Sequence, residues 1–189
     1  LGYQKFIQEP NEAEAANEMN QAQQFFDAAI NASGTEQDSL FTRSLSGGNG
    51  KFGFEDIVTN YSGTKAGELA NYYAGLSHLN LGNYQEAIDY LDRFNVDDEI
   101  LTPLAKGSIG DAFLQLDQPD EALGYFEKAA NLRSNEFTTP KFLLKAAVTA
   151  ISLGDGNTAL KHLNRIKDEF PDSAEAKEVD VYLGQAEVL

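Results

Sequence analysis

The stretch GLSHLNLGNYQEAIDYL, residues 75–91, decides the fold of this chain. It has the pattern of two helices joined by a tight turn at residues 81–83, where glycine follows leucine. Gly75 and Ala87 place small side chains where two helix backbones must approach closely, and Leu91 supplies an apolar contact one turn after Ala87. The spacing therefore predicts a helical hairpin.

The same skeleton returns twice, after 35 residues and then after 37 residues. The matched positions are Gly75, Gly110 and Ala147; Ala87, Ala122 and Ala159; and Leu91, Phe126 and Leu163. A constant interior with connecting loops of variable length is typical of repeated helical hairpins. Such units bury their apolar faces against one another. The core is therefore predicted at Tyr73, Ala74, Tyr84, Ala87, Ile88, Leu91, Ile109, Phe113, Ala122, Leu123, Phe126, Ala146, Ala147, Leu160, Leu163 and Ile166.

The repeated unit resembles the tetratricopeptide repeat, a helix–turn–helix of ~34 residues. The resemblance covers residues 65–189 and departs from the family pattern at Asp117, which replaces a turn glycine. It rests on Gly75, Gly82, Tyr84, Ala87 and Leu91, on Gly110, Ala122, Phe126 and Ala129, and on Ala147, Gly154, Ala159, Leu163 and Pro171. The resemblance implies an all-α, right-handed α–α superhelix, that is, a solenoid that binds other proteins and is not an enzyme.

The sequence predicts one continuous domain that ends in a capping helix. Its expected segments are residues 1–64, 65–101, 102–138, 139–173 and 174–189. We interpret the first segment as a degenerate, split repeat with an N-terminal helix, a flexible loop and a short helix. Within the loop, Asp38 to Leu45 could form a short turn of helix before the Gly-rich residues 46–50.

The composition excludes several classes of function. The chain has 30 acidic and 14 basic residues, a net charge of −16, which argues against nucleic acid as a partner. The acidity fits either a solvated surface or an acidic binding face. Cysteine is absent, which excludes disulfides and thiolate chemistry. No stretch approaches the ~18 apolar residues of a membrane span, and no signal peptide is visible.

Candidate residues for catalysis, cofactors or metals are few. His78 is expected to be a packing residue and His162 to be exposed; being in different repeats, they make a zinc site improbable. Asp97, Asp98 and Glu99 lack the spacing of a calcium loop. We therefore predict no catalytic residue, no cofactor and no metal. A hydrolase or transferase with an unrecognised acidic site is the enzymatic alternative. A cleft that holds His78 beside exposed carboxylates would favour it, and a His78 buried in apolar packing would exclude it.

By the resemblance, the first helices of successive hairpins line a concave groove. The expected lining residues are Leu69, Tyr72, Leu76, Leu79, Asn80, Leu104, Asp111, Leu114, Gln115, Lys141, Leu144, Val148 and Ile151. Exposed apolar patches of this extent mark binding sites, and a peptide or an amphipathic helix fits a groove. The alternative is self-association, with the groove filled by the N-terminal helix or a second copy in a homodimer.

Two further expectations come from resemblance alone. Lys141 and Lys145 are similar to lysines with which family members clamp a C-terminal carboxylate, but Leu76 and Ser108 stand at the places of their polar partners. Residues 52–94 resemble Bacteroidetes-type tetratricopeptide proteins anchored by one N-terminal helix, similar to the ancillary subunit of the Sec translocon. That implies a membrane span before Leu1 and a domain on the periplasmic side of the inner membrane; the alternative location is the cytoplasm.

Overall fold

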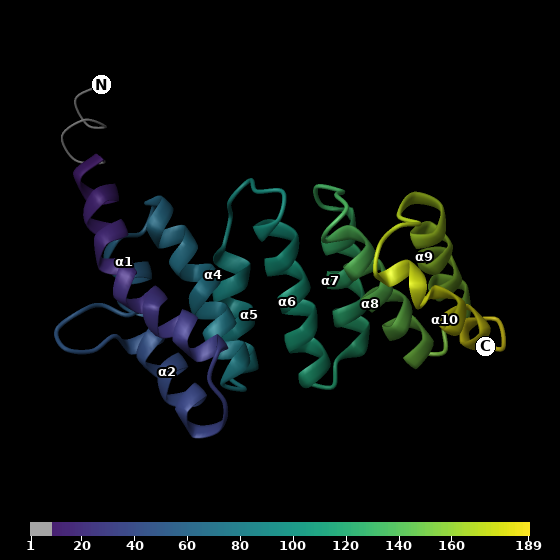
Figure 1. The fold of residues 1–189 in the computed structure, drawn as a ribbon, viewed down its shortest axis with the longest axis horizontal. Coiled ribbons are helices and arrows are strands. Elements are labelled where there is room, and N and C mark those ends of the chain that lie inside the picture. Colours follow the sequence, from purple (N-terminus) through teal and green to yellow (C-terminus); the bar gives the residue numbers. More distant parts are fainter. Residues whose placement is uncertain (1–8) are drawn as a thin grey trace. The chain divides into compact units, whose positions relative to one another are not determined.

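The computed structural model describes residues 9–189, and within that range the regular elements are all helices (Figure 1). One isolated bridge, between Gly48 and Lys51, is the only β pairing among these residues. The predicted all-α solenoid fold is therefore confirmed. The described residues form two compact units, residues 9–95 and Val96–Leu189, here named the N-terminal and C-terminal units. Residues 1–8 of the first predicted segment lie outside the described part.

Five helices are found among the described residues of the N-terminal unit. They are α1 (Glu9–Ile30), α2 (Gly34–Ser46), α3 (Phe54–Asn60), α4 (Lys65–Asn80) and α5 (Tyr84–Arg93). α1 and α2 form one hairpin, and α4 and α5 form another. The predicted turn, with Gly82 at φ +78°, joins α4 to α5. α1, α2 and α3 all pack on α4, so the first full repeat carries its own N-terminal cover.

The polar segment 35–50 differs from its expected structure. Instead of a single turn followed by a flexible loop, residues 34–46 form a complete helix, α2. Its apolar face buries Phe41 and Leu45, and the ring of Phe41 meets Phe26 of α1 edge to face at 5.6 Å. The partner of α1 is thus α2, and the split-repeat interpretation, in which α3 would be that partner, is wrong in this respect. The cause is tertiary packing, which overrides a weak local helix pattern.

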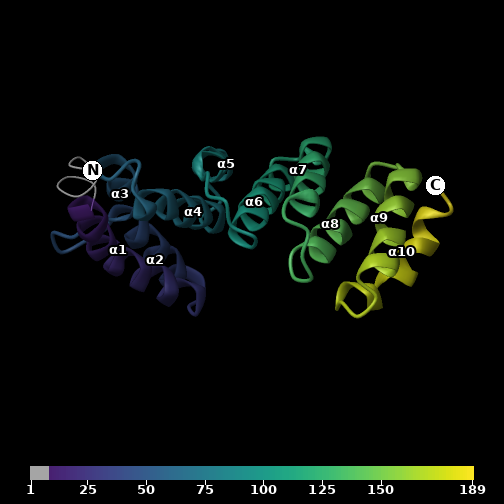
Figure 2. The same ribbon diagram turned by 90° about the horizontal axis from the view of Figure 1, so that it is seen from above.

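The C-terminal unit continues the hairpins. Its helices are α6 (Leu101–Gln115), α7 (Pro119–Asn131), α8 (Thr139–Ser152), α9 (Gly156–Glu169), the 3₁₀ turn η2 (Glu175–Lys177) and α10 (Val179–Ala186). Each helix from α6 to α9 packs against the next along the chain (Figure 2). α10 packs on α9 and α8, so the expected terminal helix is present in this unit, shorter than predicted and preceded by η2.

The small residues of the skeleton lie where the two helices of a hairpin pack closely against each other. A Cβ atom on Gly75 would stand 2.5 Å from Cγ of Leu91, and one on Gly110 would stand 2.6 Å from Cε1 of Phe126. Real Cβ atoms do not come so close, so both positions require glycine. The sequence predicts a close approach of two helices at these positions, and the side chains that meet the glycines are Leu91 and Phe126.

Most of the predicted core is buried. Eleven of its members are buried: Ala74, Ala87, Ile88, Leu91, Ile109, Ala122, Phe126, Ala146, Ala147, Leu163 and Ile166. The others (Tyr73, Tyr84, Phe113, Leu123 and Leu160) are half-buried. The sequence did not single out Phe41, Phe54, Phe142 or Val179, which are also buried. None of the described helices combines the length and apolar character needed to cross a membrane.

Candidate docking surface

An open apolar pocket of about 210 Å³ lies in the C-terminal unit. We call it the docking pocket; its lining residues are Asp111 and Leu114 of α6, Phe126 of α7, Leu144, Lys145, Val148 and Thr149 of α8, and Tyr182 of α10. The α-helical spacing of four residues puts Leu144 and Val148 on one face of α8. Leu114 and Val148 are 39% and 37% exposed, more than any residue of a packed interior, so this apolar surface meets solvent.

One ion pair crosses the pocket from α8 to α6. Nζ of Lys145 lies 2.5 Å from Oδ1 of Asp111 and 5.4 Å from the ring centroid of Phe126. Both charged side chains are about one third exposed (35% and 36%), so the pair adds little to stability. It neutralises the one carboxylate among the lining residues and fixes the lysine over the aromatic floor.

Four of the predicted groove residues meet in this pocket: Asp111, Leu114, Leu144 and Val148. The other predicted residues of the same unit do not line it. Leu104 and Ile151 are half-buried against the core, while Gln115 and Lys141 are exposed. Leu144 also packs against that core, so its side chain supports the fold as well as the pocket.

The groove residues predicted in α4 have a different environment. Leu69 and Leu76 pack against the core formed with α1, α2 and α3, and Tyr72 is 7% exposed. Burial raises the pKa of Tyr72 to about 12, with a smaller contribution from neighbouring Tyr73. Leu79 and Asn80 complete the predicted set. Leu79 is half-buried, whereas Asn80 is exposed and its amide donates to the Leu76 carbonyl oxygen. In this unit the chain's own N-terminal helices cover much of the expected groove face.

The lysines similar to a carboxylate clamp are both engaged within the chain. Lys145 is paired with Asp111, and Nζ of Lys141 lies 5.7 Å from the ring centroid of Phe142. Lys145 lines the docking pocket, whereas Lys141 does not. Phe126, Thr149 and Tyr182 were not predicted as lining residues. Tyr182 had no sequence signal for this role, because its helix was identified only as a cap.

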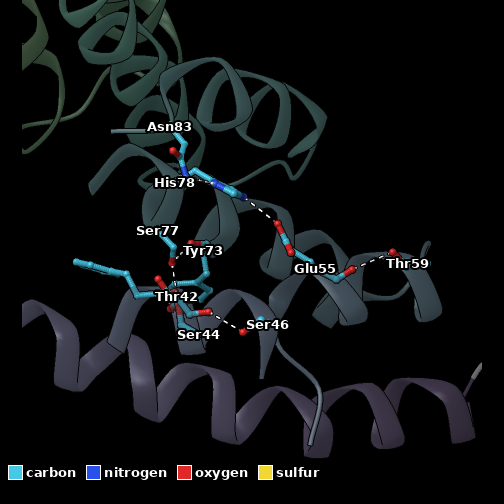
Figure 3. A network of polar contacts seen from close by, with 10 residues as sticks. Thr42, Ser44, Ser46, Glu55, Thr59, Tyr73, Ser77, His78 and Asn83 are labelled. Atoms are coloured by element: carbon cyan, nitrogen blue, oxygen red, sulfur yellow. Dashed lines mark hydrogen bonds and ion pairs between the residues drawn. The ribbon is translucent and has the colours of Figure 1, made fainter. Parts of the chain in front are cut away.

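The two histidines form matched pairs with glutamates. His78 is 7% exposed; its Nε2 lies 3.0 Å from Oε1 of Glu55 and its Nδ1 lies 3.3 Å from the Asn83 amide (Figure 3). The amide nitrogen can only donate, so Nε2 carries the proton and donates to Glu55. His78 also stacks on Tyr90 at 5.3 Å, and burial, followed by the charge of Glu55, raises the pKa of that tyrosine.

This network holds α3 onto α4. A second polar contact in Figure 3, between the hydroxyls of Ser44 and Ser77 at 2.9 Å, joins α2 to α4 in a buried position. Both nitrogens of His78 are occupied by these contacts, so its geometry fits the expected packing role.

His162 was predicted to be exposed, and this prediction is wrong. The side chain is buried, at 4% exposed, and its Nε2 lies 2.8 Å from Oε1 of Glu127 on α7. Its Nδ1 has no hydrogen-bond partner among the described residues. This hydrogen bond joins α9 to α7 through two residues that are 35 positions apart in the sequence, a contact that no local pattern shows. No group of three or more metal-ligating side chains is found within the described range.

Comparison with known families agrees with this architecture. Models of the tetratricopeptide repeat match residues 72–137 and residues 142–173, together more than half of the chain. No curated protein matches the chain. Helical hairpins, close contacts at the matched small residues and the two matched regions lead to one conclusion: the chain belongs to the tetratricopeptide repeat family.

Proposed function

We propose that the docking pocket binds an apolar segment of a partner protein, as a peptide or as one face of a helix. Repeats of this family generally mediate protein–protein interaction and are typically not enzymes. The observation that carries the proposal is the solvent exposure of Leu114 and Val148 within one hollow of the C-terminal unit. Burying such side chains against a partner is favourable by ~25 cal/mol for each Å² of apolar surface.

Binding can be tested by placing a charge in the pocket. Leu114→Asp combined with Val148→Asp should abolish partner capture, because a buried unpaired carboxylate is costly. Val181→Asp is the matched control, since Val181 is 65% exposed on α10 and does not line the pocket. Leu144 is unsuitable for this purpose, because it packs against the core and a charge there would also reduce stability.

The readout is affinity capture from the membranes and extracts of the source organism, with circular dichroism as the folding control. The proposal expects partners with the unmodified chain and with Val181→Asp, and none with the double variant. Equal capture by all three folded chains would show that another surface binds the partner.

The proposed role is non-enzymatic. The enzymatic alternative requires a cleft that holds His78 beside exposed carboxylates. The half-exposed carboxylate of Glu55 lies beside His78, but this histidine is buried and both its ring nitrogens make contacts within the fold. His162 is buried against Glu127. Neither pair lies in the docking pocket.

We also propose a membrane-tethered location, on the periplasmic side of the inner membrane. This rests on the resemblance of residues 52–94 to anchored tetratricopeptide proteins and on nothing in the described helices. Fractionation of the source cells tests it: the native protein should sediment with membranes and become protease-sensitive when the outer barrier is opened. Recovery in the cytosolic fraction would support the alternative.

Self-association is the second candidate function. It is supported by the N-terminal unit, where α1, α2 and α3 cover the α4 face that carries Leu69 and Leu76. For the docking pocket of the C-terminal unit, this alternative assigns a second copy of the chain as the occupant.

A further inference from the structure

The most exposed large aromatic side chain among the described residues belongs to Phe137. It is 80% exposed and stands in the loop between α7 and α8, in the C-terminal unit. Exposed phenylalanines carry a large apolar surface, and buried aromatic anchors dominate the energetics of many protein interfaces. Phe137 is therefore a candidate anchor outside the docking pocket.

The loop that carries Phe137 is held by one asparagine. Oδ1 of Asn135 accepts from the backbone N–H groups of Phe137 and Thr138 at 2.9 and 2.8 Å. Its Nδ2 donates to Oγ1 of Thr138 at 2.8 Å and to the carbonyl oxygen of Glu99 at 2.9 Å. The loop is thus ordered before any contact is made, and binding through it costs little conformational entropy.

The loop and the docking pocket differ in charge. Glu136 precedes Phe137 in the loop and is exposed. Glu99, also exposed, lies next to the loop, because its carbonyl oxygen accepts a hydrogen bond from Asn135. The pocket carries Lys145 in its lining, with Lys141 exposed one turn earlier on α8. Lys145 is neutralised by Asp111, and Arg133 of the loop is paired with Asp97. The net charges are therefore those of Lys141 beside the pocket and of Glu136 and Glu99 in and beside the loop. The acidic loop with its aromatic tip is complementary to an apolar hollow that has Lys141 on one side.

We propose that Phe137 of one copy of this chain inserts into the docking pocket of a second copy. The pocket holds about 210 Å³ and is lined by apolar atoms of Leu114, Phe126 and Val148, so it offers an aromatic side chain apolar contacts. Each copy carries one Phe137 and one pocket, and a twofold dimer makes the contact twice. The inference rests on the proposed function, because it assigns an occupant to the same pocket.

The contact is small and must be transient. One aromatic side chain buries ~150–250 Å², and two such contacts remain well below the ~1,200–2,000 Å² of a stable interface. The net charge of −16 on each copy opposes association further. Self-docking at high local concentration would then compete with a partner protein for the pocket, and a tight partner would displace it.

Sedimentation of the whole chain over a wide range of concentrations tests the proposal. The unmodified chain should show a concentration-dependent mass between monomer and dimer. Phe137→Ser and Val148→Asp should each weaken association about tenfold or more, the expected effect of losing one buried aromatic contact. Val181→Ser, a change at another exposed apolar residue, should leave it unchanged.

A photo-reactive amino acid at position 137 supplies a second measurement that does not depend on the stability of a variant. It should crosslink to residues 111–114 or 144–149 of a second copy. A chain that stays monomeric throughout, association that survives Phe137→Ser, or crosslinks only to other residues would overturn the inference. Partner capture lost in the pocket variant but unaffected at position 137 would leave the proposed function standing alone. Self-association without any partner capture would do the reverse.

Discussion

Replacing Gly107 with alanine should destabilise the C-terminal unit although alanine is the better helix former. Gly107 is buried in α6, and a Cβ there would lie 2.7 Å from Cδ1 of Phe142 and overlap Cε1 and Cζ of the same ring. The ring cannot move freely, because Phe142 is 2% exposed and stacks on Phe126 at 6.5 Å.

The magnitude follows from two opposing terms. Overpacking a core costs ~1–3 kcal/mol, and the overlap at Gly107 belongs at the upper end. Alanine in a helix interior gains about 1 kcal/mol over glycine. The net loss should be about 2 kcal/mol. Gly124 is the matched control, since it lies exposed in α7 with nothing within 4 Å of a Cβ, and Gly124→Ala should stabilise by about 0.5–1 kcal/mol.

Urea unfolding followed by circular dichroism measures both changes. If the two units unfold separately, the transition that Gly124→Ala moves upward should be the one that Gly107→Ala moves downward. A second substitution, Phe142→Leu, replaces the ring with a smaller side chain. The double variant Gly107→Ala, Phe142→Leu should recover part of the unfolding free energy lost in Gly107→Ala, because the two sites are in contact and their effects are not additive. A Gly107→Ala chain as stable as the unmodified one would refute the packing argument.

Three further predictions concern single side chains. Thr64→Ala should cost about 1 kcal/mol in urea unfolding, because the Thr64 hydroxyl caps α4 by accepting from the N–H of Gly67 at 3.0 Å. Hydrogen bonds from Thr158 lower the pKa of Asp155. The ionised Asp155 therefore stabilises the fold fully above about pH 4, and this stabilisation is lost as the pH falls through the lowered pKa. The melting temperature of the unmodified chain should exceed that of Asp155→Asn at neutral pH, and the difference should vanish in acid. The pKa of Tyr72, raised by burial to about 12, gives stability that is complete below about pH 10 and lost between pH 10 and 12; Tyr72→Phe should flatten the alkaline melting profile in that window.

The repeat skeleton made the hairpins accessible to sequence reasoning. Gly75 contacts Leu91 and Gly110 contacts Phe126, each within a single hairpin. The regular spacing of these residues along the chain therefore indicates where the two helices of a hairpin pack together. The contact of Gly107 with Phe142 joins two hairpins and was not predicted. The only signal was a second glycine one turn before Gly110, which has no match in the other repeats.

Long-range burial explains what the sequence did not show. α2 is helical because Phe41 and Leu45 find an apolar surface on its neighbours, a fact absent from its own polar sequence. The buried state of His162 depends on Glu127 of another helix. Four of the residues predicted to line a groove, on α6 and α8, line one pocket of the C-terminal unit. The helices α1, α2 and α3 pack on α4, in the chain's first full repeat; the N-terminal helix was the alternative occupant that the sequence left open, whereas the contributions of α2 and α3 had no signal in the sequence.

Photo-crosslinking from Val148 in the source cells tests the docking pocket most directly. A photo-reactive amino acid replaces Val148, and the same group at Val181 on α10 serves as the control, since both side chains are exposed but only Val148 lines the pocket. We expect discrete crosslinked products from position 148 that are absent from position 181 and disappear when Leu114 is replaced by aspartate. Identical products from both positions, or none from position 148 in the folded protein, would contradict this expectation.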